Sequence, residues 1–435
     1  MDRTFHIESL GCAKNQVDAE VMIAALERAG WTFTAAPEDA AVLVLNTCGF
    51  IEAARRESIE TGLALRSRFP RSRLFLVGCL TERYAAELAA EMPEIDGFLG
   101  NRDPARIVDL VEGQASPRAS VPPRRRRLLS YTGSAYLKVA EGCANRCSYC
   151  AIPLIRGDLA SRPRAEVVEE ARGLLASGAR ELVLIAQDLG SYGRDRGTAE
   201  LPALLADLAA LPGRFWVRLL YVHPDHFPLD VLPIMRDDPR FLPYLDVPFQ
   251  HASPAILAAM GRTADPEANL RLVERLRAEL PGAVLRSTFL VGFPGETDRD
   301  AELLAGFQEA AALDWVGVFT YSREEGTRAH DLAGRVPRRV AEARRAAVEE
   351  RQVPITWARL DRHLGAEMDV LVEERVEGEE LSIGRAYLQA PDVDGLTVVR
   401  ASREPGTVVR VRVERRNGFD LEGTPIEDGV PPGAR

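Results

Sequence analysis

Short apolar segments alternate with amphipathic stretches along most of this chain, and this alternation constrains the fold more than any other feature. Strands that alternate with helices form a parallel sheet with helices on both faces. We therefore predict an amino-terminal, doubly wound α/β domain over residues 1–115. Its expected strands and helices are Phe5–Gly11, Ala41–Thr47 and Arg73–Gly78, and Val17–Ala29 and Ile51–Arg68.

The alternation continues on a longer scale over residues 134–365, where we expect six β/α repeats and a long final helix over residues 337–364. Six repeats are typical of a partial (β/α)6 barrel, in which the chemistry lies at the carboxyl ends of the strands. The expected strands are Ala135–Ala140, Glu181–Ala186, Phe215–Tyr221, Tyr244–Phe249, Val284–Val291 and Trp315–Tyr321, and the helices between them include Ala165–Ala176, Leu201–Ala210 and Pro266–Leu280.

Two segments break this pattern. Residues 116–133 contain Pro117, Pro122 and Pro123 and the basic run Arg124–Arg127, which indicates an exposed linker. Its arginines are either a solvated tether or a contact with RNA or substrate. Residues 366–435 contain short strands between Gly and Pro turns, and we predict a small all-β barrel there.

Composition excludes several classes of protein. No apolar run approaches the roughly 18 residues of a membrane helix, and the first residues do not resemble a secretory signal. We therefore expect a cytoplasmic protein that does not contact a membrane. The net charge of −10 argues against a protein that coats nucleic acid. Six cysteines in 435 residues are too few for a disulfide scaffold, so their pattern points to metal or catalysis.

Three of the cysteines form one compact motif. Cys143, Cys147 and Cys150 have the spacing C-x3-C-x2-C directly after the first strand of the predicted barrel. Three thiolates on one loop can bind three irons of a [4Fe–4S] cluster and leave the fourth iron open. A structural zinc site normally needs four protein ligands, and no fourth Cys or His lies nearby in the sequence.

The other three cysteines, Cys12, Cys48 and Cys79, lie far apart in sequence, but each follows a predicted strand and has a glycine beside it. The carboxyl ends of parallel strands meet at one edge of a sheet, where ligands bind. A single buried cysteine is usually just a small apolar residue. Three at equivalent strand ends indicate a second three-thiolate cluster site.

The segment Cys143-Ala144-Asn145-Arg146-Cys147-Ser148-Tyr149-Cys150 resembles the radical S-adenosylmethionine (SAM) signature. The whole chain resembles a methylthiotransferase, which has an amino-terminal three-cysteine domain, a radical SAM core and a carboxyl-terminal TRAM barrel. Several segments are similar to the RimO-type branch, which modifies an aspartate of small-subunit ribosomal protein twelve. Ala13 departs from that branch, which usually has Pro there. The similar segments are Ser9–Asn15, Ala135–Cys143, Arg156–Asp158 and Gln250–Ser253.

This resemblance implies two [4Fe–4S] clusters and SAM as cofactors. The cluster on Cys143, Cys147 and Cys150 would bind SAM and split it into methionine and a deoxyadenosyl radical. That radical would remove a hydrogen from the β-carbon of the aspartate. The cluster on Cys12, Cys48 and Cys79 would hold the sulfur, which a second SAM would methylate. The cofactors thus carry the difficult chemistry, and no further catalytic residue is assigned.

Polar residues at the ends of the barrel strands are candidates for the SAM pocket, since ligands bind at such ends. By resemblance, Tyr149 would lie near the adenine and Gly292 in the Gly-rich turn close to SAM. Residues 292–297 lack the lysine of a phosphate-binding P-loop. His223, His226 and His330 have no ligand spacing and are interpreted as ordinary polar residues. The full candidate set is Tyr149, Gln187, Asp188, Gln250, Arg286 and Gly292.

The expected substrate is an aspartate in a small-subunit ribosomal protein, free or in the assembled subunit, and the alternative is a tRNA adenosine (MiaB-type). From Glu367 to Arg435 there are 15 acidic and 9 basic residues, a net of −6, which suits a basic ribosomal protein better than tRNA. Arg410, Arg412, Arg415 and Arg416 could still form a basic strip. A third hypothesis, a non-enzymatic iron–sulfur or zinc module that binds ribosomes, requires closed four-ligand sites. An electron-donor protein is an expected partner, and nothing demands more than a monomer.

Overall fold

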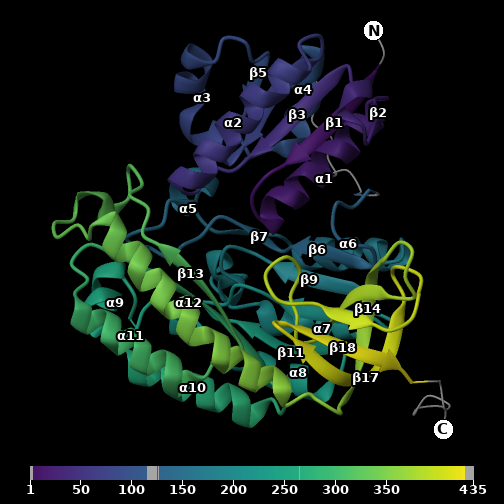
Figure 1. The fold of residues 1–435 in the computed structure, drawn as a ribbon. Coiled ribbons are helices and arrows are strands. Elements are labelled where there is room, and N and C mark those ends of the chain that lie inside the picture. The colour runs from purple at the N-terminus through teal and green to yellow at the C-terminus, as the bar shows by residue number, and fades with distance from the viewer. Residues whose placement is uncertain (1–2, 115–124, 126, 264, 427–435) are drawn as a thin grey trace.

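The computed structural model describes residues 3–114, 125, 127–263 and 265–426, and Figure 1 shows their arrangement. The amino-terminal sheet lies at the top of this view, the central sheet with its green helices below it, and the yellow carboxyl-terminal barrel at the lower right. None of the described helices is both long and apolar enough to span a bilayer.

The amino-terminal domain is a five-stranded parallel sheet in the order β2-β1-β3-β4-β5. Side chains alternate across it, so that Val42 and Val44 face α1 and α4, while Leu43 and Leu45 pack in a second core with residues of α2 and α3. Burial on both faces is why these strands are apolar without interruption. The elements are β1 (Thr4–Ser9), α1 (Ala13–Arg28), β2 (Thr32–Phe33), β3 (Val42–Thr47), α2 (Glu52–Arg68), β4 (Arg73–Gly78), α3 (Cys79–Glu91), β5 (Gly97–Leu99) and α4 (Ile107–Glu112).

The central domain is a parallel six-stranded sheet in the order β13-β12-β11-β10-β9-β6. Its outer face packs against the helices that connect the strands. The strands are β6 (Ser134–Lys138), β9 (Glu181–Ile185), β10 (Trp216–Leu219), β11 (Phe241–Asp246), β12 (Val284–Val291) and β13 (Trp315–Thr320). The helices are α5 (Ile152–Arg156), α6 (Arg164–Ala176), α7 (Leu201–Ala209), α8 (Val231–Asp237), α9 (Pro254–Met260), α10 (Pro266–Glu279), α11 (Asp298–Ala311) and α12 (Arg338–Asp361). A short antiparallel pair, β7 (Ala140–Glu141) and β8 (Ala160–Ser161), follows β6.

The carboxyl-terminal strands close into a barrel in the order β14-β15-β16-β18-β17. They are β14 (Glu367–Arg375), β15 (Ser382–Ala386), β16 (Thr397–Val399), β17 (Val408–Asn417) and β18 (Asp420–Pro425). With the doubly wound first sheet and the six-stranded parallel second one, this barrel confirms the predicted fold class.

The carboxyl-terminal barrel packs against the inner face of the central sheet, and buried polar contacts fix the junction. Glu181 of β9 accepts hydrogen bonds from Arg218 of β10 at 2.7 Å and from Arg385 of β15 at 2.7 Å, and all three side chains are buried. Trp315 Nε1 also donates to the carbonyl of Leu388 at 2.8 Å. Because a buried carboxylate is costly unless paired, these two arginines are needed to keep Glu181 charged at the junction.

Replacing Glu181 with glutamine is expected to lower the free energy of unfolding by about 3–5 kcal/mol near neutral pH, because it leaves the buried Arg218 guanidinium without its counter-charge and Arg385 with Glu373 alone. Burial alone would raise the pKa of Glu181, but Arg385 and Arg218 lower it to about 2 from its ordinary value of 4.5. Because the pKa of Glu181 is lower in the folded than in the unfolded state, its charged carboxylate stabilises the fold above pH 4.5. This contribution is lost as the pH falls toward 2. Denaturant unfolding of the wild type and of Glu181→Gln should be measured as a function of pH. The difference between their free energies of unfolding should become smaller below about pH 4.5. A difference independent of pH would contradict this assignment.

Two arginines of the predicted linker's basic run are described: Arg127 is exposed, as a solvated linker would be, whereas Arg125 is not. The Arg125 side chain is 1% exposed and forms ion pairs with Glu20 of α1 and, at 2.6 Å, with Glu170 of α6. It is therefore neither a solvated tether nor a contact with RNA or substrate, because two carboxylates from different domains, the buried Glu20 and the partly buried Glu170, bind it. Pro117, Pro122, Pro123, Arg124 and Arg126 lie outside the described residues.

Candidate active site

The three amino-terminal cysteines come together at the carboxyl edge of the first sheet. Cys12 precedes α1, Cys48 follows β3, and Cys79 is the first residue of α3 directly after β4. The neighbouring glycines are required by this close approach. A Cβ on Gly11, whose φ is +92°, would lie 2.9 Å from Cys48 Cβ and 3.2 Å from its Sγ, and one on Gly49 would lie 2.6 Å from Leu80 Cα. Larger residues at these positions would push the thiol-bearing loops apart.

Polar groups surround the most buried of these thiols. Cys79 Sγ donates to Asn15 Oδ1 at 3.1 Å and accepts from Asn101 Nδ2 and Arg156 Nη2, both at 3.3 Å. Burial raises the pKa of Cys79 and raises that of Cys48 to about 12. In the metal-free chain these thiols therefore stay protonated at neutral pH, and a bound cation is what would deprotonate them.

The second set of thiols lies on the loop between β7 and α5. Its backbone is fixed from outside: Cys143 N donates to the carbonyl of Gly157 at 3.2 Å, and Ser148 N donates to that of Met260 at 2.8 Å. A Cβ on Gly142, whose φ is +69°, would lie 2.1 Å from the carbonyl oxygen of Asp158. Burial raises the pKa of Cys143 to about 11 and that of Cys150 to about 12.

Both sets offer only sulfur donors, and all six cysteines are free thiols. In the described part of the chain, no three His, Cys, Asp or Glu side chains are arranged to hold a single metal ion. Three thiolates without a fourth protein ligand are the donor set of a [4Fe–4S] cluster with one open iron. The residues present therefore fit the two clusters that the sequence implies.

Asp188, which follows β9, organises the region beside the second set of thiols. Its Oδ2 accepts from Asn145 Nδ2 of the cysteine loop at 2.8 Å, from Ser191 Oγ at 2.5 Å and from His226 Nε2 at 2.6 Å. Burial alone would raise the pKa of Asp188, but the hydrogen bonds from His226 and Ser191 hold it below its usual range. Asp188 therefore anchors the cysteine loop to the end of the central sheet.

Two histidines that sequence analysis treated as ordinary polar residues also lie at this site. His223 Nε2 is 4.0 Å from Cys147 Sγ, and its ring stacks on that of His226 with centroids 4.8 Å apart. Burial and the nearby Arg262 lower the pKa of His223 to about 3, so the imidazole is neutral. Their place after β10, at a strand end like that of Asp188, is the sequence signal that could have identified them.

A buried polar network runs from the first set of thiols into the central domain. Besides Cys79, Arg156 of α5 contacts Asn15 Oδ1 at 2.6 Å and Asp18 Oδ2 at 2.9 Å in the amino-terminal domain, and Glu141 Oε1 at 2.8 Å in the central domain. Glu141 also accepts a hydrogen bond from Gln187 Nε2 at 2.8 Å. Gln187, one of the predicted SAM-pocket residues, therefore belongs to this network. Arg156 thus connects a thiol of the first set to the strand that leads into the second.

Tyr149 belongs to the cysteine loop itself, whereas Gln250 follows β11 and pairs with β12. Tyr149 Oη accepts from Arg262 Nη2 at 3.0 Å, and the ring packs beside the buried core around Met260 and Phe293. Gln250 has a φ of +70°, an uncommon conformation for a residue other than glycine. Its N–H donates to the carbonyl of Thr288 at 2.8 Å, and the amide of Leu290 donates to its carbonyl at 2.7 Å, so pairing with β12 holds this conformation.

Arg286, on the inner face of β12, lies between two carboxylates. It forms ion pairs with Asp246 at 3.5 Å and with Asp394 of the carboxyl-terminal barrel at 3.4 Å. Burial raises the pKa of Asp394 to about 6. Lys14 lies in the same interior, 3.2 Å above the ring of Tyr221, and burial lowers its pKa to about 8. The carboxyl-terminal barrel therefore contributes a charged group to the interior of the central sheet, which sequence reasoning did not anticipate.

Gly292 begins a turn whose backbone donors are already satisfied within the protein. The amides of Gly292 and Phe293 both donate to the buried carboxylate of Glu296, the second at 3.0 Å. A Cβ on Gly292, whose φ is +75°, would lie 2.4 Å from Ala341 Cβ of α12. This arrangement agrees with the exclusion of a phosphate-binding loop. The strand ends thus bring Asp188, Gln250 and Gly292 to one side of the central sheet, together with the Cys143–Cys150 loop.

Comparison with known families matches three parts of the chain: residues 4–100 to "Uncharacterized protein family UPF0004", residues 137–307 to the radical SAM superfamily, and residues 364–426 to the TRAM domain. Among solved structures, the radical SAM methyltransferase TsrM from Kitasatospora setae, with cobalamin and a [4Fe-4S] cluster bound, shares the fold with a TM-score of 0.56 at 17% identity. That match covers 76% of this chain and 77% of TsrM.

Curated relatives match over nearly the full length. The chain is 40% identical to the ribosomal protein uS12 methylthiotransferase RimO of Treponema denticola, over 96% of this chain and 99% of that protein. It is 44% identical to that of Desulforudis audaxviator, over 95% of each. With this identity over all three parts of the sequence, the chain belongs to the RimO family of methylthiotransferases within the radical SAM superfamily.

Proposed function

We propose that this protein adds a methylthio group to the β-carbon of an aspartate in ribosomal protein uS12, with SAM as both methyl donor and radical source. The observation that carries the proposal is the pair of three-cysteine sites, one at the carboxyl edge of each parallel sheet, with a buried network that runs from Cys79 of the first set to Glu141, two residues before the second. The full-length relatives bear the name of this activity. As a radical SAM family member, the chain is a SAM-dependent transferase whose cofactors are SAM and [4Fe–4S] clusters.

Cys143, Cys147 and Cys150 would hold the cluster that binds SAM, and Cys12, Cys48 and Cys79 the cluster that carries sulfur. When bound, these groups supply the electron, the radical and the sulfur. The protein's own residues position and shield them. Asp188 fixes the cysteine loop through Asn145, and Arg156 donates to Cys79, so that its thiolate form is stabilised. Tyr149, Gln187, Gln250, Arg286 and Gly292 complete the proposed SAM pocket.

The surface charge of the carboxyl-terminal barrel supports a ribosomal protein over a tRNA adenosine. The arginines that could have formed a basic strip are each paired with an acidic side chain: Arg410 with Asp369 at 3.1 Å, Arg412 with Glu367 at 2.9 Å, Arg415 with Glu422 at 2.6 Å and Arg416 with Asp361 at 2.7 Å. Paired charges leave little positive potential along these strands for a phosphate-rich partner. A highly basic protein partner does not need positive potential on these strands.

The remaining parts of the proposal concern organisation and partners. Residues 1–115, 134–365 and 366–435 act as cluster domain, radical SAM core and TRAM barrel, with residues 116–133 as the linker. The enzyme works in the cytoplasm as a monomer and receives electrons from a donor protein.

The test is mass spectrometry of ribosomal proteins and of tRNA from cells with and without the gene. We expect one ribosomal protein, uS12, to lose the mass of a methylthio group, while tRNA is unchanged. Loss of the group from tRNA instead would assign the enzyme to the MiaB-type reaction. No change in either would leave the proposal without a substrate and refute it.

A further inference from the structure

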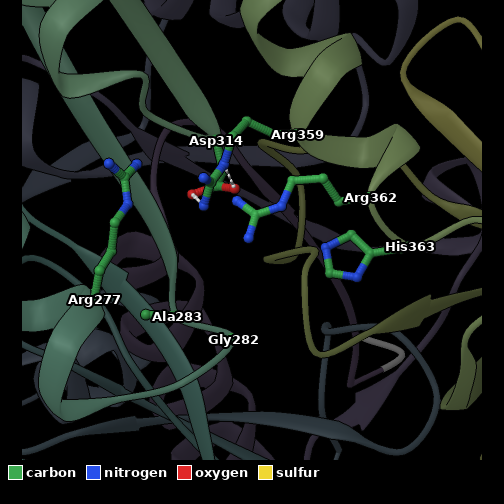
Figure 2. A pocket seen from close by; sticks show the side chains of 7 residues that line it. All are labelled: Arg277, Gly282, Ala283, Asp314, Arg359, Arg362 and His363. Atoms are coloured by element: carbon green, nitrogen blue, oxygen red, sulfur yellow. Dashed lines mark hydrogen bonds and ion pairs between the residues drawn. The ribbon is translucent and has the colours of Figure 1, made fainter.

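We propose that a basic pocket of the central domain, where His363 contacts Tyr387 of the carboxyl-terminal barrel, binds a backbone phosphate of ribosomal RNA when the enzyme docks on the assembled small subunit. This inference rests on the proposed function, because it says that the enzyme meets uS12 in the assembled small subunit and not as a free protein. Figure 2 shows the pocket, whose lining residues are Arg277, Gly282, Ala283, Asp314, Arg359, Arg362 and His363.

The pocket is remote from the cysteine sites within the central domain. Gly282 and Ala283 precede β12, and Asp314 precedes β13, so the pocket lies at the amino ends of these strands, whereas the thiols lie beside carboxyl ends. Arg277 comes from the last turn of α10, and Arg359 from the last turn of α12. The cavity measures about 110 Å³. A water occupies about 30 Å³ in the liquid, so the cavity has room for a phosphate-sized group.

The pocket holds more positive than negative charge. Asp314 is its single carboxylate, and Arg359 already occupies both oxygens, at 2.6 Å and 3.2 Å, while the amide of Leu285 donates to Oδ2 at 2.9 Å. Arg277 donates to the neutral carbonyl of Ala312 at 2.7 Å, and its Nε is buried without a hydrogen-bond partner. Arg362 has no ion pair or side-chain hydrogen bond among the described residues. Two guanidinium groups therefore lack a counter-charge.

This crowding of like charges has an electrostatic cost that an anion would relieve. Burial and the nearby Arg359 lower the pKa of Arg277 below its ordinary value, and burial also lowers that of His363. A phosphate oxygen matches the planar fork of a guanidinium, and such charge-assisted hydrogen bonds are stronger than those between neutral groups. Arg277 and Arg362 both line the cavity shown in Figure 2, so either guanidinium group can donate to a phosphate bound there.

The rest of the molecule indicates which phosphate this is. With a net charge of −10 and a carboxyl-terminal barrel whose arginines are paired, the protein is not built to track a nucleic acid over a long surface. A single basic pocket suits one or two phosphates, which position a partner without reading its sequence. The assembled small subunit presents such phosphates next to its proteins, whereas isolated uS12 does not.

The test compares Arg362→Ala with a matched control, Arg339→Ala. Arg362 is exposed, so its removal should not disturb folding; Arg339 is an exposed residue at the other end of α12, also without an ion pair among the described residues. The probe is purified small ribosomal subunits from a strain that lacks the gene. We expect Arg362→Ala to bind them several-fold more weakly and to lower the slope of log affinity against log salt by about one. Arg339→Ala should change neither, and Arg362→Lys should keep the slope.

Other measurements separate this inference from the proposed function. Both alanine variants should cleave SAM at the wild-type rate without substrate and should bind isolated uS12 as the wild type does. The inference is overturned if Arg362→Ala binds small subunits with the affinity and the salt dependence of the wild type. It is also overturned if the variant loses as much affinity for isolated uS12 as for subunits, or if its salt dependence changes only for binding to tRNA. If the wild type leaves uS12 unmodified, the proposed function fails, and the salt dependence of subunit binding still decides whether the pocket holds a phosphate.

Discussion

Replacing Cys147 with alanine is expected to abolish SAM cleavage and to leave the amino-terminal cluster assembled. Cys147 is the central thiol of the loop that would hold the SAM-binding cluster, and its Sγ lies beside the neutral imidazole of His223. Two thiolates should not hold a cluster that needs three. Cys12, Cys48 and Cys79 lie in the amino-terminal domain, away from this loop in sequence, so they should still bind iron. The measurements are 5′-deoxyadenosine by liquid chromatography, and iron and sulfide content after anaerobic reconstitution, which should fall to about half.

Cys48→Ala is the matched control for this prediction. It should retain uncoupled SAM cleavage and lose methylthio transfer, because it removes a ligand of the other cluster only. Normal SAM cleavage by Cys147→Ala would refute the radical SAM assignment of this loop. A methylthiolated product from Cys48→Ala would refute the role of the amino-terminal thiols.

Replacing Arg156 with methionine is expected to destabilise the protein by about 3–5 kcal/mol, because it removes one partner of a buried ion-pair network. The side chain is 2% exposed and lies between Asp18 of one domain and Glu141 of the other. Methionine fills much of the volume but leaves both carboxylates with Lys138 as their shared cation. Urea unfolding of the metal-free protein measures this effect without dependence on cluster content.

Arg172→Met serves as the control for Arg156→Met. Arg172 pairs with Glu169 at 2.7 Å on the surface of α6, where both side chains are more than half exposed. Such a pair contributes about 0–1 kcal/mol. If the two variants lose the same stability, the buried network does not hold the domains together. A first unfolding transition confined to the amino-terminal domain of Arg156→Met would locate the loss at the domain junction.

Local sequence patterns predicted most of the architecture. Uninterrupted apolar runs gave strands such as β3 and β4, because strands buried on both faces are apolar throughout. The glycine beside each amino-terminal cysteine marked the close approach of the loops around Gly11 and Gly49. Whether the six cysteines bind clusters stays a prediction, but parallel topology was enough to expect three of them at one edge.

Contacts between domains could not be predicted in the same way. Arg125 belongs to a run that reads as a solvated linker, yet two acidic residues, one from each of two other helices, surround it. Arg286 was expected in the SAM pocket, and the structure also pairs it with Asp394, more than a hundred residues later in the chain. His223 has no ligand spacing in the sequence, and only the arrangement of the strand ends brings it to Cys147.

The sequence by itself determined the order of strands and helices, the three-part organisation, the two sets of three thiols and the resemblance to a family. These depend on periodicity and on residues close in sequence. Only the tertiary structure decided which charges meet: Arg156 with Cys79, Glu181 with Arg385, and Arg277 with Arg362 around one cavity. The physical reason is that burial fixes the pairing of a charged side chain, and burial results from packing between segments that the sequence does not place side by side.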